Sequence, residues 1–137
     1  MITRRTVPRR DVAAVAAIVS LIAGCGAASR AGSDDASPAG QASDRAAQGR
    51  EVSIDSGCAA CHGADGEGGI GPAWTGLAGS ERALQDGSTV VADRDYLRLS
   101  ITNPDVDKVP GFTIDMPRNQ LSTEEIELVI DYIETLR

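Results

Sequence analysis

The segment at residues 58–62, which reads CAACH, constrains this chain more than any other. It holds two of the three cysteines and the only histidine among 137 residues. A thiol redox pair, a zinc site and a covalently attached haem would each use these residues in a different way. The surrounding sequence therefore has to distinguish between the three.

Thiol exchange and structural zinc binding both lack the context that they need. A thioredoxin-like C-x-x-C pair lies near a β-α-β pattern, whereas this pair follows a helical stretch and precedes a glycine-rich one. A structural zinc site needs four nitrogen or sulfur ligands, and only Cys58, Cys61 and His62 stand close together. A disulfide between cysteines three residues apart would close a strained ring.

Covalent haem attachment explains why these residues are adjacent. Two thiols at this spacing can add to the two vinyl groups of one porphyrin, and the next residue then presents its imidazole to the iron. C-x-x-C-H is the attachment signature of c-type haem. The sequence therefore predicts one haem linked through Cys58 and Cys61 and bound at the iron by His62.

The second axial ligand has to come from another part of the chain. Apart from Met1, the sequence contains one methionine, Met116, and it contains no second histidine. Met116 lies in a predicted loop before the last helix. We therefore predict His62 and Met116 as the two iron ligands, a pair that raises the reduction potential and suits an electron carrier.

A glycine-rich segment follows the CAACH motif. Residues 66–71, GEGGIG, match the nucleotide-binding pattern G-x-G-x-x-G, but no strand precedes them and no amphipathic helix follows. The segment is instead predicted to be a tight turn that leads the chain to Pro72.

The first 25 residues have the pattern of an export signal. A head with four arginines precedes the apolar run of residues 12–23, which in a helix would span about 18 Å, too short for a hydrocarbon core of roughly 30 Å. The run ends in LIAGC, which resembles the lipobox of bacterial lipoproteins. The resemblance implies that residues 1–24 are removed, that Cys25 is acylated, and that the protein is anchored on the extracytoplasmic (periplasmic) side of a bacterial membrane.

The remaining chain is expected to divide into a linker and one domain. Residues 25–47 combine the lipidated cysteine with a small, polar stretch that predicts a flexible tether. Residues 48–137 form the predicted domain. Loss of residues 1–24, which carry a net +3, takes the formal charge from −7 to −10. So acidic a chain argues against nucleic acid as a partner and fits a basic docking patch on another protein, although the charge could equally serve solubility alone.

Apolar spacing and capping residues predict three helices. The first spans about residues 47–60. The second spans 94–102 and is capped by Asp93. The third follows the S-T-E-E capping box that begins at Ser122. Asp86-Gly87 in ALQDGSTVV predicts a small β-hairpin at residues 83–91. The fold class is therefore all-α with one hairpin insertion.

From about residue 47 onward, the sequence resembles class I c-type cytochromes. It carries CAACH, then Gly71-Pro72, then Met116-Pro117 and a final helix. The DG turn, the S-I-x-x-P segment at residues 100–104 and the V-x-G-F segment at 109–112 are similar to the cytochrome c domain fused to subunit II of some haem–copper oxidases. The resemblance implies three to four helices around one haem.

Roles for further residues follow from the same resemblance. The Pro72 carbonyl is expected to accept a hydrogen bond from His62, and Gly49 is expected to let the first helix cross the last one near Tyr132. Ser53 replaces the aromatic residue usual in the first helix. Trp74 replaces a smaller apolar residue; it is expected to contact the haem, by packing or by bonding a propionate, or to fill the core.

Together these features indicate a membrane-anchored monohaem cytochrome c and not an enzyme. It would carry single electrons between respiratory-chain partners, a terminal oxidase among the acceptors. Two alternatives stay open: a haem-based ligand sensor or small peroxidase, and a dedicated electron-transfer subunit of a dehydrogenase or reductase complex.

Overall fold

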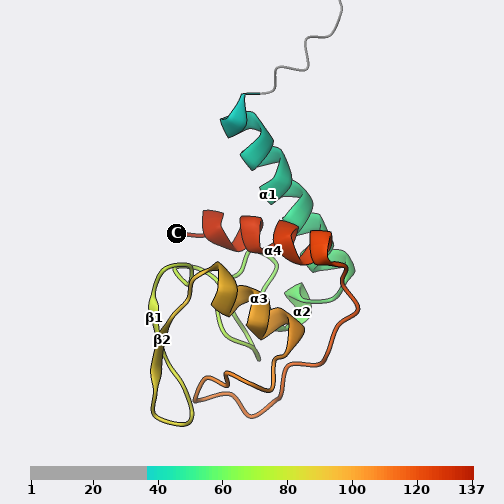
Figure 1. The fold of residues 1–137 in the computed structure, drawn as a ribbon. Coiled ribbons are helices and arrows are strands. Elements are labelled where there is room, and N and C mark those ends of the chain that lie inside the picture. The colour runs from blue at the N-terminus through green and yellow to red at the C-terminus, as the bar shows by residue number, and fades with distance from the viewer. Residues whose placement is uncertain (1–36) are drawn as a thin grey trace, which may run out of the picture. The chain divides into compact units, whose positions relative to one another are not determined.

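The structure, a computed structural model, describes residues 37–137. Four helices and one hairpin make up this part of the chain (Figure 1). The helices are α1 (Pro38–Asp55), α2 (Ala59–His62), α3 (Arg94–Thr102) and α4 (Thr123–Thr135), and the strands are β1 (Glu81–Ala83) and β2 (Thr89–Val91). The expected all-α fold with a small hairpin is confirmed. Among these residues no helix has both the length and the apolar character needed to cross a membrane.

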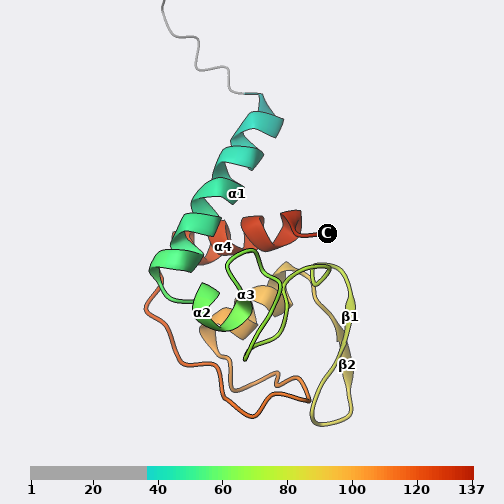
Figure 2. The same ribbon diagram turned by 180° about the vertical axis from the view of Figure 1, so that it is seen from behind.

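Helix α1 packs across α4 in the most extensive contact between elements (Figures 1 and 2). The two backbones approach most closely at Gly49, where a Cβ atom would overlap the carbonyl oxygen of Leu128 and lie 3.0 Å from Cβ of Tyr132. The crossing expected at Gly49 is therefore confirmed. Ser53, one turn later, is only 1% exposed and donates to the Arg50 carbonyl at 2.7 Å, so a small hydroxyl occupies the place of an aromatic ring.

Helix α4 supplies half of the central core. Its capping box is complete, because the Ser122 hydroxyl accepts from the Glu125 N–H and the Glu125 carboxylate accepts from the Ser122 N–H. The buried cluster consists of Trp74, Leu77, Ala92, Leu97, Ile101, Ile126, Val129, Ile130, Tyr132 and Ile133. Helix α3 joins it through Leu97 and Ile101 and begins where predicted, with the Asp93 carboxylate accepting from Tyr96 N–H at 2.9 Å.

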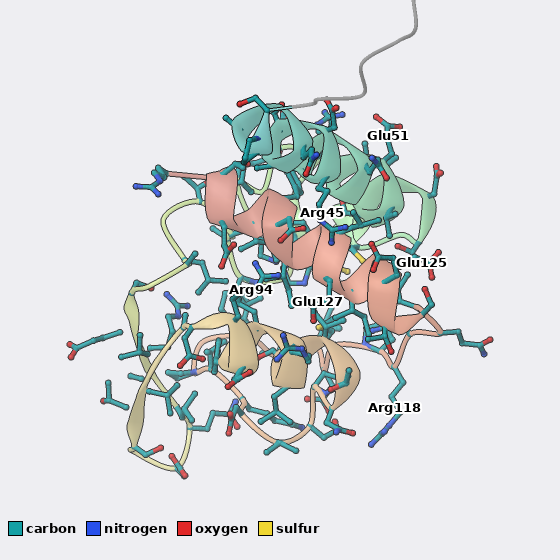
Figure 3. All side chains as sticks on the ribbon, turned by 45° about the horizontal axis from the view of Figure 1, so that its top comes forward. Arg45, Glu51, Arg94, Arg118, Glu125 and Glu127 are labelled. Atoms are coloured by element: carbon teal, nitrogen blue, oxygen red, sulfur yellow. The ribbon has the colours of Figure 1, made fainter. Side chains whose placement is uncertain are left out.

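Arginines from two helices converge on the acidic face of α4 (Figure 3). Arg45 of α1 and Arg94 of α3 both bind Asp131, at 2.6 and 2.9 Å. Arg94 and Arg98 both bind Glu127, at 2.8 and 2.7 Å. The hydrogen bonds from Arg98 and then Arg94 lower the pKa of Glu127 to about 2. These pairs connect α1 and α3 to the same side of α4.

The start of the domain differs from the sequence prediction. Helix α1 begins at Pro38, so the prediction of a flexible linker is wrong for residues 38–47. Two contacts explain the extension: Ala46 is buried, and Arg45 pairs with both Asp131 and Glu124 of α4. Pro38 itself suits a first helical position. Residues 1–36, with the predicted signal segment, Cys25 and the rest of the linker, lie outside the described residues.

The first predicted helix is also divided in two. Helix α1 ends at Asp55, and Gly57, at φ +82°, turns the chain before the short helix α2 begins at Ala59. A positive φ favours glycine, so the turn is a local consequence of Gly57. The predicted continuous helix over residues 47–60 is therefore wrong at residues 56–58, near its end.

The hairpin lies at one edge of the fold and is tied to the loop after α3 (Figure 2). Its antiparallel register pairs Arg82 with Val90, and Gly87, at φ +88°, forms the predicted turn. The Gln85 N–H donates to the Lys108 carbonyl at 2.8 Å, and the Gln85 side chain donates to the Val109 carbonyl at 3.3 Å. The hairpin thereby positions the segment that leads to Met116.

The crossing at Gly49 generates a stability prediction. Gly49→Ala should lower the free energy of unfolding by about 1–3 kcal/mol, because the added methyl forces two helix backbones apart. Gly40→Ala is the matched control, since the same helix leaves open space at that position; there the substitution should be neutral or stabilise by about 0.5–1 kcal/mol. Denaturant unfolding measures both. Equal values for the two variants would contradict the close crossing.

Candidate functional site

The CAACH motif lies on the short helix α2, directly after the turn at Gly57. Cys58 and Cys61 are both free thiols and both half-buried. His62 ends the helix, and Gly63 at φ +88° turns the chain away. The motif therefore presents two thiols and an imidazole from a single turn of helix.

The imidazole of His62 is buried and held in one orientation. It is 8% exposed, and its Nδ1 lies 2.7 Å from the Pro72 carbonyl oxygen. A carbonyl only accepts, so Nδ1 carries the hydrogen and Nε2 keeps its lone pair. Burial lowers the pKa of His62, and the bond to Pro72 offsets part of that effect. A neutral imidazole with a free Nε2 is the form that binds a metal.

The glycine-rich segment packs directly against this motif. Gly68 N–H donates to the His62 carbonyl at 2.7 Å, and Gly71 N–H donates to the Cys61 carbonyl at 2.9 Å. A Cβ on Gly71 would lie 3.2 Å from Cε1 of His62. The segment is therefore the tight turn that the sequence predicts, and it carries the chain to Pro72.

Trp74 lies on the imidazole. Its ring stacks on that of His62 with centroids 4.7 Å apart and planes at 18°, and it meets Tyr132 edge-on at 6.3 Å. Trp74 is only 6% exposed and belongs to the central buried cluster. It therefore lines the site and fills the core at once.

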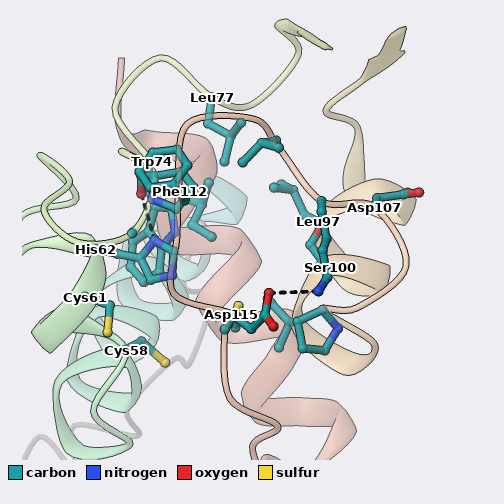
Figure 4. A pocket seen from close by; sticks show the side chains of 18 of the residues that line it. Cys58, Cys61, His62, Trp74, Leu77, Leu97, Ser100, Asp107, Phe112 and Asp115 are labelled. Atoms are coloured by element: carbon teal, nitrogen blue, oxygen red, sulfur yellow. Dashed lines mark hydrogen bonds and ion pairs between the residues drawn. The ribbon is translucent and has the colours of Figure 1, made fainter. Parts of the chain in front are cut away.

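A large, mostly apolar pocket opens beside the motif (Figure 4). Its empty volume is about 1190 Å³ with the open mouth included. Cys58, Cys61 and His62 lie on one side, and Leu97 and Ser100 of α3 lie on the other. Further walls come from α4 and from the loop between α3 and α4, with these residues: Val129, Ile133, Phe112, Ile114, Met116 and Pro117. Met116, which is half-buried, thus reaches the same pocket as the CAACH motif.

The residues present fit a haem. A flat porphyrin needs apolar walls, thiols for attachment and an imidazole for the iron, and this pocket offers all three. One further observation supports a ligand with polar groups: the Ser100 hydroxyl on the pocket wall is buried and has no hydrogen-bond partner in the part of the chain described. Within residues 37–137 no three His, Cys, Asp or Glu side chains gather as a metal-binding cluster.

The fold and the site define a small protein built around a covalently attached haem. A model of one protein family, described as cytochrome c, matches residues 46–137, which is more than half of the chain. The protein therefore belongs to the cytochrome c family. Membership implies a covalently attached haem c and a role as an electron carrier. A search of individually curated proteins found no match.

Most residues that line the pocket were not singled out from the sequence as site residues, and Ser100 and Arg82 are two polar examples. Ser100 stood only within the S-I-x-x-P resemblance, and Arg82 reaches the pocket from β1. Ser100 follows Leu97 by three residues on α3, so the apolar face of that helix could have indicated it. No local pattern could have indicated Arg82, because the hairpin's placement depends on its tie to Lys108 and Val109.

The unpaired hydroxyl generates a prediction for the haem-bound protein. Ser100→Ala should lower the free energy of unfolding of the haem-bound protein by about 1 kcal/mol. The reason is that the Ser100 hydroxyl would lose a hydrogen bond to the haem or to a group bound together with it. Removal of a truly unpaired buried hydroxyl would instead be neutral or stabilising. Denaturant unfolding of the purified haem protein shows whether the substitution destabilises or stabilises it. A stabilised variant would contradict a hydrogen bond between Ser100 and the bound group.

Proposed function

We propose that this protein is a lipid-anchored monohaem cytochrome c that carries single electrons at the extracytoplasmic face of a bacterial membrane. In the proposed site Cys58 and Cys61 form the thioether links, and His62 and Met116 bind the iron. The observation that carries the proposal is the state of His62. Its Nδ1 is engaged by Pro72, its Nε2 makes no hydrogen bond in the described structure, and the ring lines the pocket that Met116 also lines.

Each residue of the site has a distinct task in electron transfer. The haem iron supplies the one-electron chemistry. Pro72 holds the His62 tautomer, which keeps the ligand nitrogen ready in both oxidation states. The apolar walls, among them Leu97 and Val129, exclude water from the porphyrin faces. Met116 offers a soft thioether sulfur, which raises the potential relative to two nitrogen ligands.

The proposed anchor limits how far the domain can move from the membrane. Helix α1 begins thirteen residues after Cys25, and thirteen residues span at most about 45 Å. Lipoprotein processing would attach at least two acyl chains, and two chains anchor a protein stably where one does not. The protein would then meet redox partners that are themselves at the membrane surface.

The partners in this proposal are redox proteins, not nucleic acid. A respiratory donor such as a reductase or dehydrogenase would supply the electron, and an oxidase or another acceptor would take it. The formal charge of −10 after processing supports docking against a basic surface. The resemblance to the oxidase-fused cytochrome c domain supports a terminal oxidase as acceptor.

Replacement of Met116 tests the ligand assignment. Met116→Ala should lower the reduction potential and allow carbon monoxide to bind the reduced iron promptly, because the iron would lose its proposed sulfur ligand. Visible spectra in both redox states, with and without carbon monoxide, measure this. The variant must still show haem on the polypeptide after denaturing electrophoresis, since Cys58 and Cys61 are unchanged. An unaltered spectrum would show that Met116 does not bind the iron. Prompt binding of carbon monoxide by the unsubstituted protein would favour a ligand sensor or small peroxidase.

Replacement of Cys25 tests the anchor separately. Cys25→Ser should release the haem protein from the membrane fraction into the soluble extracytoplasmic fraction, since no acylation site remains. Fractionation followed by haem staining measures the distribution, and the unsubstituted protein is the control. A variant that stays wholly in the membrane fraction would contradict the anchor. Gel filtration of a detergent extract would show whether the protein is free or a permanent subunit of a larger complex.

A further inference from the structure

The stack between Trp74 and His62 is the closest aromatic contact of the described residues, and it involves the proposed iron ligand. The two rings lie nearly parallel, at 18°, with their centroids 4.7 Å apart. Trp74 meets its other aromatic neighbour, Tyr132, at 87°. Trp74 therefore offers the face of its indole to His62 and the electrostatics of that face act on the imidazole.

Two contacts together fix the imidazole. The hydrogen bond from Nδ1 to the Pro72 carbonyl holds the ring at one edge. The indole covers one face of the ring and resists its rotation about the Cβ–Cγ bond. Trp74 is in turn held by a hydrogen bond from its backbone N–H to the Gly66 carbonyl at 2.8 Å and by burial of its side chain in the core.

We propose that Trp74 is a positioning residue for electron transfer: it orients the His62 imidazole and, through the negative face of its indole, stabilises the oxidised iron and so lowers the reduction potential. The inference rests on the proposed function, in which His62 binds the iron. Trp74 acts through His62 and need not touch the iron itself.

The sign follows from the charge on the imidazole. An aromatic face carries negative potential and attracts a positive neighbour, most strongly for tryptophan and in a desolvated place. An imidazole bound to ferric iron is more positive than one bound to ferrous iron. The indole therefore favours the ferric state. Because the charge on the ring changes only by a fraction, we expect a two- to tenfold effect on the equilibrium constant of reduction, about 20–60 mV for one electron.

A purely space-filling role for Trp74 would give the opposite sign. Loss of a large buried ring would loosen the core and admit water beside the haem. Water stabilises the more highly charged ferric state, so the potential would fall. Loss of the stack, by contrast, removes a contact that favours the ferric state, so the potential would rise.

The experiment compares substitutions in the complete haem protein by redox titration. Trp74→Leu should raise the reduction potential by the amount that corresponds to a two- to tenfold change in the equilibrium constant of reduction. Trp74→Phe keeps an aromatic face and should shift the potential less. Tyr132→Leu is the matched control, because it removes a ring of the same buried cluster that does not stack on His62; its potential should not rise. The shifts of the haem methyl protons in the ferric protein should change for Trp74→Leu, since they report the imidazole plane, and stay close to the original for Trp74→Phe.

The outcomes separate this inference from the proposed function. A spectrum typical of histidine and methionine ligands together with an unchanged or lowered potential in Trp74→Leu overturns the inference alone. A spectrum of the unsubstituted protein that lacks a histidine ligand overturns both. If Trp74→Leu does not yield folded protein, Trp74→Phe decides. A reduction potential below that of the unsubstituted protein, or haem methyl shifts that differ clearly from those of the unsubstituted protein, overturns the inference.

Discussion

The close crossing of α1 over α4 at Gly49 is the constraint on which the rest of the structure depends. Only a residue without a side chain lets the two backbones approach at Leu128. Helix α2 follows α1 after a three-residue turn, so the crossing also decides where the CAACH motif lies relative to α4. Arg45 and Arg94 then fix α1 and α3 against Asp131 of the same helix. Helix α4 therefore positions both sides of the pocket, because α1 and α3 are each fixed against it.

The sequence predicted those features whose cause is local. The capping box at Ser122, the cap at Asp93 and the turn at Gly87 each depend on a few neighbouring residues, and all three are present. The contact between His62 and Pro72 was also expected, although from a family resemblance and not from the residues alone. A cofactor attached through adjacent residues leaves a signature that a single sequence can reveal.

The turn at Gly57 has a local cause that the sequence analysis missed, whereas two other missed features depend on contacts between distant residues. The polar, small-residue composition of residues 38–47 indicated a tether, but the pairing of Arg45 with Asp131 and the burial of Ala46 make this segment helical. The stack of Trp74 on His62 likewise needs the glycine turn to bring residues twelve apart together. Neither contact leaves a pattern among neighbouring residues. An arginine or a tryptophan could equally well lie in another part of a fold, so the residue types alone did not indicate these contacts.

The segment that carries Met116 has no helix or strand between α3 and α4, yet it is held along its length. Gln85 binds it at Lys108 and Val109, Lys108 pairs with Asp115 at 2.8 Å, and Asn119 donates to the Ile101 carbonyl at 2.7 Å. A ligand on a segment braced in this way changes position little when the charge of its metal changes. In the proposed electron carrier, the hairpin would thereby help to give a low reorganisation energy, which favours rapid exchange of the electron.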